Sequence, residues 1–204
     1  PVVVGLVAFG ISFATNIEDN PLGTRTISGC ELEAVTRCDE SDLSGADLTR
    51  AVLTDASFEE VDFTDADLTD ADLFSATLDD CVLTGATLAG VDLSGAVLAD
   101  LDLSGLDLST TDLGDADLAE SNLSDVTLTN GFLHDADLLD ASLTNADLSG
   151  ADLSGAILEG ADLTGANLAG ASLVEADLSG ADLTGANLTG ADLTNALTDG
   201  AILE

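Results

Sequence analysis

The sequence predicts an all-β solenoid, a rod in which short coils of chain stack on one another. Three observations support this prediction. From Ser41 to Asn195 the chain runs through 31 units of five residues with no insertion or deletion. The central residue of every unit is Leu, except at Phe58 and Phe63. The residue two positions before it is Ala in 21 of the 31 units and is never charged. We therefore expect one continuous core in one elongated domain.

A period of five residues matches neither the 3.6 of a helix nor the 2.0 of a simple strand. The clearest units, in residues 146–165, follow the pattern Ala-Asp-Leu-Ser/Thr-Gly. We expect the Leu and the preceding Ala to point inward and the chain to turn at the Ser/Thr-Gly step, where Gly leaves φ free. Repeated turning closes a coil, and coils stack by backbone pairing at roughly 4.8 Å. The period alone leaves the number of units per coil open.

The charge balance is extreme, because 40 Asp and Glu stand against 3 Lys and Arg, for a formal net charge of −37. This excludes a nucleic-acid-binding surface, since phosphates need cations, and it argues against an anionic membrane partner. Disorder is not expected, because 46% of the residues are hydrophobic and they recur at strict intervals. High salt screens such a surface, which favours a halophilic source. The alternative is that the negative charge is itself functional.

Residues 1–16 form the one long uncharged apolar run. The run is shorter than the roughly 20 residues of a membrane-spanning helix, and its Val, Ile and Phe content favours a strand. It could be the remnant of an export or anchor segment, in which case membrane contact is expected. It could instead cap its own solenoid or pack on a neighbouring subunit, and the last option is preferred. The candidate contact residues are Val2, Val4, Leu6, Phe9, Ile11 and Phe13.

Residues 17–40 are expected to hold a linker, with turn signals at Asn20-Pro21 and Gly23, and then an irregular first coil from Cys30. Cys30 and Cys38 are candidates for a disulfide if the protein is exported. Without further Cys or His they do not make a zinc site. Cys81 occupies an inward position, where a small buried hydrophobe is expected.

The pattern A(D/N)LXX over residues 41–195 closely resembles the pentapeptide-repeat family, and 31 gapless units make the resemblance highly specific. The resemblance implies a right-handed quadrilateral β-helix over residues 41–204, with four units per coil, about eight coils and a length of about 37 Å. Residues twenty apart would then stack into carboxylate ladders such as Asp72, Asp92 and Asp112, or Asp162 and Asp182. A solvated ladder is expected over a metal site, because calcium needs about six to eight oxygens at one point.

The outward pattern breaks at a few apolar residues. Phe132 and Ile157 replace Asp before the central Leu, and Phe74, Leu139 and Val174 replace Ser or Thr after it. The four-unit coil implied by the resemblance places Phe74, Phe132 and Val174 on one face, and Leu139 and Ile157 on the adjacent face. On so acidic a surface they suggest a lateral contact patch. Scattered apolar surface residues are the alternative.

Catalytic signatures are missing from the sequence. His134 is the only histidine and lies at an outward position, and no nucleophile is paired with a base by motif. A convex rod also offers no pocket for a substrate. We therefore expect no enzyme, cofactor, bound metal or small-molecule substrate.

Two functions are predicted from this pattern. The first is an extracellular or cell-surface structural protein that assembles with itself head to tail. In it the apolar N-terminal segment covers the uncapped last coil at Leu197, Ile202 and Leu203. The alternative follows from the resemblance, since some family members bind DNA gyrase by mimicking DNA. That function implies a cytoplasmic protein.

Overall fold

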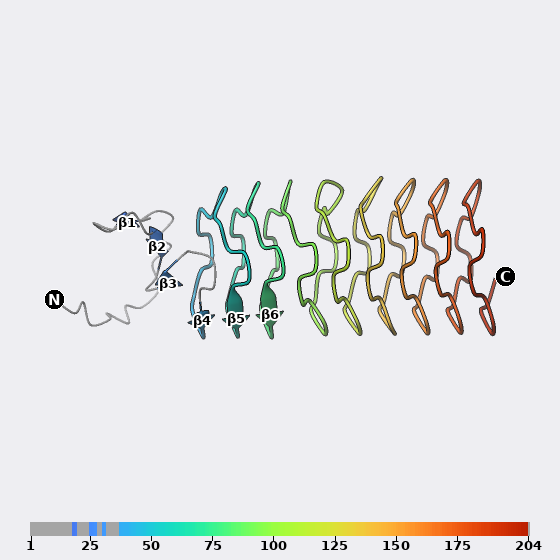
Figure 1. Cartoon of the computed structure of the whole chain (residues 1–204), viewed down its shortest axis with the longest axis horizontal. Coiled ribbons are helices and arrows are strands. Elements are labelled where there is room, and N and C mark those ends of the chain that lie inside the picture. The colour runs from blue at the N-terminus through green and yellow to red at the C-terminus, as the bar shows by residue number, and fades with distance from the viewer. Residues whose placement is uncertain (1–17, 20–24, 28–29, 32–36, 204) are drawn as a thin grey trace.

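The computed structural model describes residues 18–19, 25–27, 30–31 and 37–203. Residues 37–203 form a β-helix whose coils stack along one axis, from blue to red in Figure 1. Among the described residues, no helix is long and apolar enough to cross a membrane.

The coils pair in parallel with a fixed register. Strands β4 (Arg37–Asp39), β5 (Ser57–Glu59) and β6 (Thr77–Asp79) form a parallel sheet in which Cys38, Phe58 and Leu78 stack. Single bridges continue this pairing to the end of the rod, as in Asp162↔Asp182 and Asp182↔Ile202. Bridged partners are always twenty residues apart, so one turn of the coil takes four pentapeptides. The ladders Asp72, Asp92, Asp112 and Asp162, Asp182 are therefore formed as predicted.

Before the rod, three short strands form an antiparallel sheet. They are β1 (Glu18–Asp19), β2 (Arg25–Ile27) and β3 (Cys30–Glu31), in the order β1-β2-β3. This differs from the expected linker, and the predicted turn signals lie between β1 and β2. The predicted contact residues Val2, Val4, Leu6, Phe9, Ile11 and Phe13 lie outside the described residues.

Every backbone amide of a regular unit has an acceptor. In residues 161–165 the five amides donate, in order, to Leu158 O, Ala141 O, Asp182 O, Asp162 Oδ1 and Thr184 O, at 2.8–3.1 Å. Three of these bonds join neighbouring coils, one closes the turn, and one ends on the Asp side chain of the same unit. The repeat therefore satisfies its buried backbone without long strands.

The fifth residue of each unit forms a corner. From 40 to 200, every corner residue except Thr110 has φ between 52° and 79°, the left-handed region; most are Gly, Asp, Asn or Glu, and Arg50 and Ser75 also adopt it. Gly meets this need without strain, and Asn and Asp tolerate it better than other residues. The composition of the corner column is therefore set by backbone conformation.

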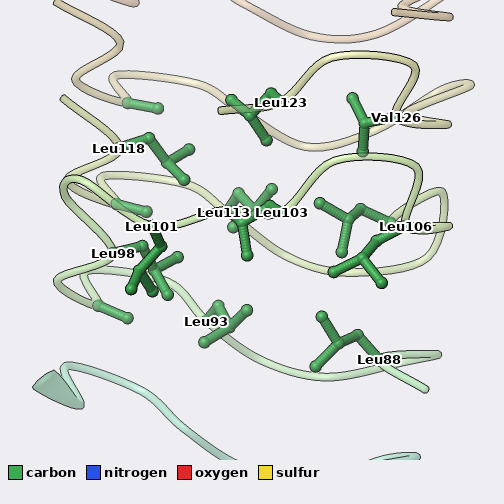
Figure 2. Packing of buried hydrophobic residues seen from close by; sticks show 14 of the residues in the cluster. Leu88, Leu93, Leu98, Leu101, Leu103, Leu106, Leu113, Leu118, Leu123 and Val126 are labelled. Carbon is green, nitrogen blue, oxygen red and sulfur yellow. The ribbon is translucent and has the colours of Figure 1, made fainter. Parts of the chain in front are cut away.

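The core consists of the stacked central residues and the small residues two positions before them. The central Leu side chains from Leu43 to Leu183 are at most 3% exposed. Phe58 and Phe63 pack edge to face, with ring centroids 5.3 Å apart. Two buried hydroxyls bond to backbone oxygens, Thr111 to Leu88 O and Ser121 to Leu118 O. Figure 2 shows part of this cluster.

The repeat does not fail at Thr198, where the sequence pattern is imperfect. Leu197 bridges Asp177, and the amide of Ala201 donates to Thr198 O as in a regular turn. The backbone ladder therefore tolerates a polar central residue in the last coil.

Candidate interaction surfaces

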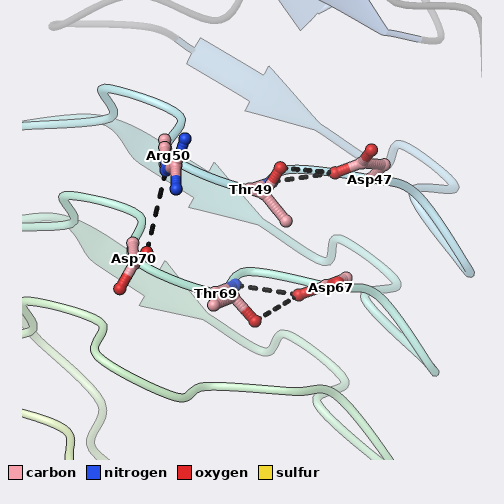
Figure 3. Close-up of polar contacts among 6 residues, drawn as sticks. All are labelled: Asp47, Thr49, Arg50, Asp67, Thr69 and Asp70. Atoms are coloured by element: carbon pink, nitrogen blue, oxygen red, sulfur yellow. Dashed lines mark hydrogen bonds and ion pairs between the residues drawn. The ribbon is translucent and has the colours of Figure 1, made fainter.

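The Asp residue before each central Leu holds its own turn. Asp42 Oδ1 accepts from the amide of Ser44 at 3.0 Å and from its hydroxyl at 2.6 Å. Figure 3 shows the same arrangement for Asp47 with Thr49 and Asp67 with Thr69. These carboxylates thus accept local hydrogen bonds from the backbone amide and the hydroxyl two residues later.

The same bonds lower carboxyl pKa values. Hydrogen bonds from the following Ser or Thr, first from its side chain, hold the pKa of Asp42 and Asp162 below the ordinary value. Hydrogen bonding to the ionised form favours that form. Asp102, Asp107, Asp147, Asp152, Asp177 and Asp192 behave alike. No group of three or more potential metal ligands occurs in the described part of the chain.

One corner of the rod carries an unbroken column of acidic side chains, here called the acidic corner. Its six residues are exposed, lie twenty apart and share the left-handed conformation; they are Glu40, Glu60, Asp80, Asp100, Glu120 and Asp140. Gly160, Gly180 and Gly200 continue the column without charge. The acidic corner therefore runs along the N-terminal part of the rod. Sequence analysis missed it, although positions twenty apart would have revealed it.

Positive charge does little to offset this surface. Arg50 Nε lies 3.7 Å from Asp70 Oδ2, and both side chains are mostly exposed (Figure 3). Such an exposed ion pair contributes little to stability. His134 is exposed, and its charge helps to lower the pKa of Asp152.

The predicted lateral residues take the predicted faces but do not merge into one patch. Asp112↔Phe132 and Asp137↔Ile157 are bridged, which fixes two adjacent faces. Phe74, Phe132 and Ile157 are 46%, 53% and 40% exposed, whereas Leu139 and Val174 are half-buried. On their shared face, the coils holding Asp92 and Asp112 lie between Phe74 and Phe132. Sequence analysis also missed the exposed Val52 and Val82.

The last described coil exposes apolar residues of the core and of the faces together. Leu188 and Leu193, central residues of the repeat, are only partly buried, unlike those of inner coils. Leu197, Ile202 and Leu203 are 57%, 48% and 55% exposed. The amides of Leu188 and Leu193 have no backbone acceptor, because no further coil lies above them in the described chain. Apolar side chains and unpaired strand edge thus occur together in this coil.

The cysteines fall into two kinds. Cys38 is disulfide-bonded and its side chain is buried in the first coil. The predicted partner Cys30 has a side chain outside the described part of the structure, so the pairing stays a prediction. Cys81 is free and buried at an inward position, as predicted. Burial raises the pKa of its thiol to about 11.

The repeat and its twenty-residue register define the class of protein. The family model for pentapeptide repeats matches residues 41–80, 76–115, 121–160 and 161–197. The chain belongs to the pentapeptide-repeat family. No curated protein matches its sequence.

Solved structures with the same repeat include HetL, a pentapeptide repeat protein involved in regulating heterocyst differentiation in Nostoc sp. strain PCC 7120. It is 30% identical over 85% of this chain and 89% of its own, with a TM-score of 0.41. Rfr23 from Cyanothece 51142 is 22% identical over 85% and 87%, with a TM-score of 0.29. QnrB1, a plasmid-mediated fluoroquinolone resistance protein, is 17% identical over 80% and 93%, with a TM-score of 0.25.

Proposed function

We propose that this protein is a non-enzymatic structural protein that assembles with copies of itself through its last coil. The observation that carries the proposal is the joint exposure of Leu197, Ile202 and Leu203 beside unpaired amides in the coil of residues 184–203. A second copy supplies both missing elements, a parallel or antiparallel strand edge and apolar side chains. Such a head-to-tail contact propagates when it does not close. The proposed covering segment is residues 1–16 of the next copy.

The proposed place of action is outside the cell, in a medium of high salt. The disulfide of Cys38 supports an oxidising compartment, since disulfides persist there. The net charge of −37 supports high salt, because at molar ionic strength the Debye length shrinks to about 3 Å. Under those conditions two such rods approach each other without strong repulsion.

The proposal extends to the finer shape of the rod. We infer the right-handed four-sided form with about eight coils that the family resemblance implies. The constant twenty-residue offset of the bridges supports four sides per coil.

Sedimentation velocity of the full chain in molar salt tests the proposal. Species larger than the monomer are expected to grow with protein concentration. Leu203→Asp places a charge in the exposed apolar cross-section, so association should be lost. Val52→Asp is the matched control, because both residues are 55% exposed but Val52 lies on a side face. A wild-type protein that stays monomeric, or equal effects of both variants, would contradict the proposal.

The acidic corner favours a second candidate, a regulator that mimics DNA and binds DNA gyrase. Its carboxylates follow one another at the coil spacing of roughly 4.8 Å, while one DNA strand carries a phosphate for about every 3.4 Å of helix axis. A protein groove built for DNA would therefore meet a similar line of charge. This function would place the protein in the cytoplasm.

A gyrase supercoiling assay distinguishes the two candidates. The mimic is expected to inhibit supercoiling at near-stoichiometric amounts. Glu60→Gln with Asp80→Asn and Asp100→Asn should weaken that inhibition, whereas Leu203→Asp should not. No inhibition at large excess, in salt that gyrase tolerates, would eliminate this candidate.

A further inference from the structure

The backbone ladder of the rod is interrupted at one level. Val82 pairs with Asp62, and Asp102 pairs with Asn122, but Val82 and Asp102 are not bridged to each other. On the next face, Thr87 and Asp107 of the same two coils are also not bridged to each other. Within residues 37–203 no other level lacks two of its four bridges. Figure 1 shows wider spacing of the coils in the green part of the rod, after β6. We call this interruption, between residues 80–90 and 99–110, the seam.

The other two faces of these coils remain joined. Asp92↔Asp112 and Val97↔Asp117 are bridged, and the amides of Leu93 and Leu98 donate across the level at 2.8 and 2.7 Å. The coils are therefore attached along one side and separated along the other. This is the geometry of a hinge.

Two large inward side chains account for the separation. Leu101 and Leu106 occupy the position two before the central Leu, which holds Ala in most units. In the preceding coil, twenty residues earlier, the equivalent inward positions hold the smaller residues Cys81 and Ala86. Figure 2 shows Leu101 beside Leu98, and Leu106 above Leu88, inside the rod. Extra side-chain volume in a close-packed interior forces backbone shifts.

A third residue of the same coil breaks the corner. Thr110 is the one corner residue from 40 to 200 without a positive φ. A β-branched side chain strongly disfavours the left-handed region. The amide of Gly90 donates to Thr110 Oγ1 at 3.0 Å in place of the usual backbone oxygen. The local sequence 101–110 thus departs from the repeat at three positions: Leu101 and Leu106 lead into the two separated faces, and Thr110 lies at the corner between the separated face of Asp107 and the bridged face of Asp112.

The seam leaves polar backbone unpaired beside the core. The amides of Leu83, Leu88, Asp102 and Asp107 have no backbone acceptor, unlike their counterparts in neighbouring coils. The inward residues there are also more exposed than those of the other inner coils, with Cys81 at 7% and Leu106 at 8%. An unpaired amide costs free energy unless water reaches it, so the closed seam gains less from closure than any regular level.

We propose that the seam is a built-in opening point at which residues 101–203 swing away from residues 37–100 about the two bridged faces. In a solenoid each coil contacts only its neighbours, so one weak level divides the rod into two cooperative blocks. Opening exposes Cys81 and the strand edges of both blocks while each block stays folded. This inference is independent of the proposed function, because it concerns the middle of the rod and not its last coil.

Cys81 is a native probe of this opening. In the closed rod its thiol is buried and neutral, so it reacts slowly with a maleimide. We expect wild-type Cys81 to be labelled in native molar-salt buffer by partial opening, with a weaker denaturant dependence than global unfolding. Peptide mass spectrometry locates the label. Labelling that occurs only with global unfolding would overturn the proposal.

A closing variant gives the matched comparison. Leu101→Ala, Leu106→Ala and Thr110→Gly together restore the repeat, and labelling of Cys81 should slow by about tenfold or more as hydrogen bonds re-form. Val126→Ala is the control, because Val126 follows Leu106 in the same column at a level where the ladder is intact. Its effect on Cys81 should be small. An unchanged rate in a folded closing variant would also overturn the proposal, and if that variant does not fold, the wild-type denaturant dependence decides.

Discussion

At the scale of single residues, the repeat is a solution to backbone hydrogen bonding. Where Asp precedes the central residue, its Oδ1 accepts the amide two residues later, inside the same unit. Asn performs the same task, as the bond from Thr189 to Asn187 Oδ1 shows at 3.1 Å. The acidity of the face positions thus has a local structural cause. The negative charge at the corners has no such local cause, because the uncharged residues Gly and Asn adopt the same corner conformation.

Asp162→Ala removes the acceptor for the amide of Thr164, which lies 2.9 Å from Asp162 Oδ1. We expect a loss of about 1 kcal/mol in the free energy of unfolding. Asp162→Asn should lose much less, because its amide oxygen still accepts. Urea unfolding in molar salt measures both. Equal losses would show that charge, and not hydrogen bonding, is what matters at this position.

The contribution of Asp162 depends on pH in a defined direction. Its pKa is lowered in the folded protein by bonds from Thr164, so the unfolded chain binds a proton more readily. The stabilisation is therefore complete above the unfolded pKa of about 3.9 and is lost as the pH falls through the folded value. The difference in unfolding free energy between wild type and Asp162→Ala should shrink below about pH 4. A difference that grows on acidification would contradict this assignment.

Gly185→Ala tests the conformational demand of the corners. Gly185 has φ +73° and open space around the position of a Cβ. The left-handed conformation should cost an Ala about 1 kcal/mol, and Gly185→Asn should cost less. Thermal unfolding of the two variants checks the order. Equal stability of Ala and Gly would show that the corner relaxes easily.

At the scale of the coil, burial distinguishes the middle of the rod from its end. Leu153 and Leu193 occupy the same column, but Leu153 is fully buried and Leu193 is not. Leu153→Ala should cost about 3 kcal/mol or more. Leu193→Ala should cost clearly less in dilute protein, and as much as Leu153→Ala once the last coil is covered by another copy. Unfolding at low and high protein concentration measures the pair.

The coil is also the scale at which sequence reasoning was most successful and where it stopped. The unit, its inward Leu and Ala and the stacking of Asp72 on Asp92 followed from the period and the family resemblance. The effect of Leu101 and Leu106 did not follow, although the sequence places both at inward positions that hold Ala in most units. Side-chain volume can be absorbed by repacking or by separating coils, and only coordinates show which occurs. Thr110 gave a signal that position-by-position comparison of corners would have found.

The antiparallel strands before the rod were not predicted either. Residues 17–29 lack the five-residue period, and strands of two or three residues carry too little pattern to be recognised. The exposed residues Val52 and Val82 were missed because Val also suits a strand interior. For the three strands and for these two valines alike, the sequence does not show which residues of the chain lie next to them in space.

At the scale of the whole molecule, repulsion between the many carboxylates is expected to control how stability depends on salt. A net charge of −37 on a narrow rod repels itself, and the repulsion falls with ionic strength. We expect the thermal midpoint of unfolding to rise steeply between dilute buffer and molar NaCl. Sodium chloride and potassium chloride should act alike, because screening does not depend on an ordered cation site. A rise specific to one cation would contradict this account.

The proposed self-assembly depends on the part of the rod where the backbone pairing is incomplete, above all on the last coil. Hydrogen exchange of the full chain at low and high protein concentration, in molar salt, tests this most directly. The amides of Leu188 and Leu193 should exchange fast in dilute protein and become protected as concentration rises, while those of inner coils stay protected throughout. Fast exchange of these two amides at every concentration would contradict self-assembly through the last coil.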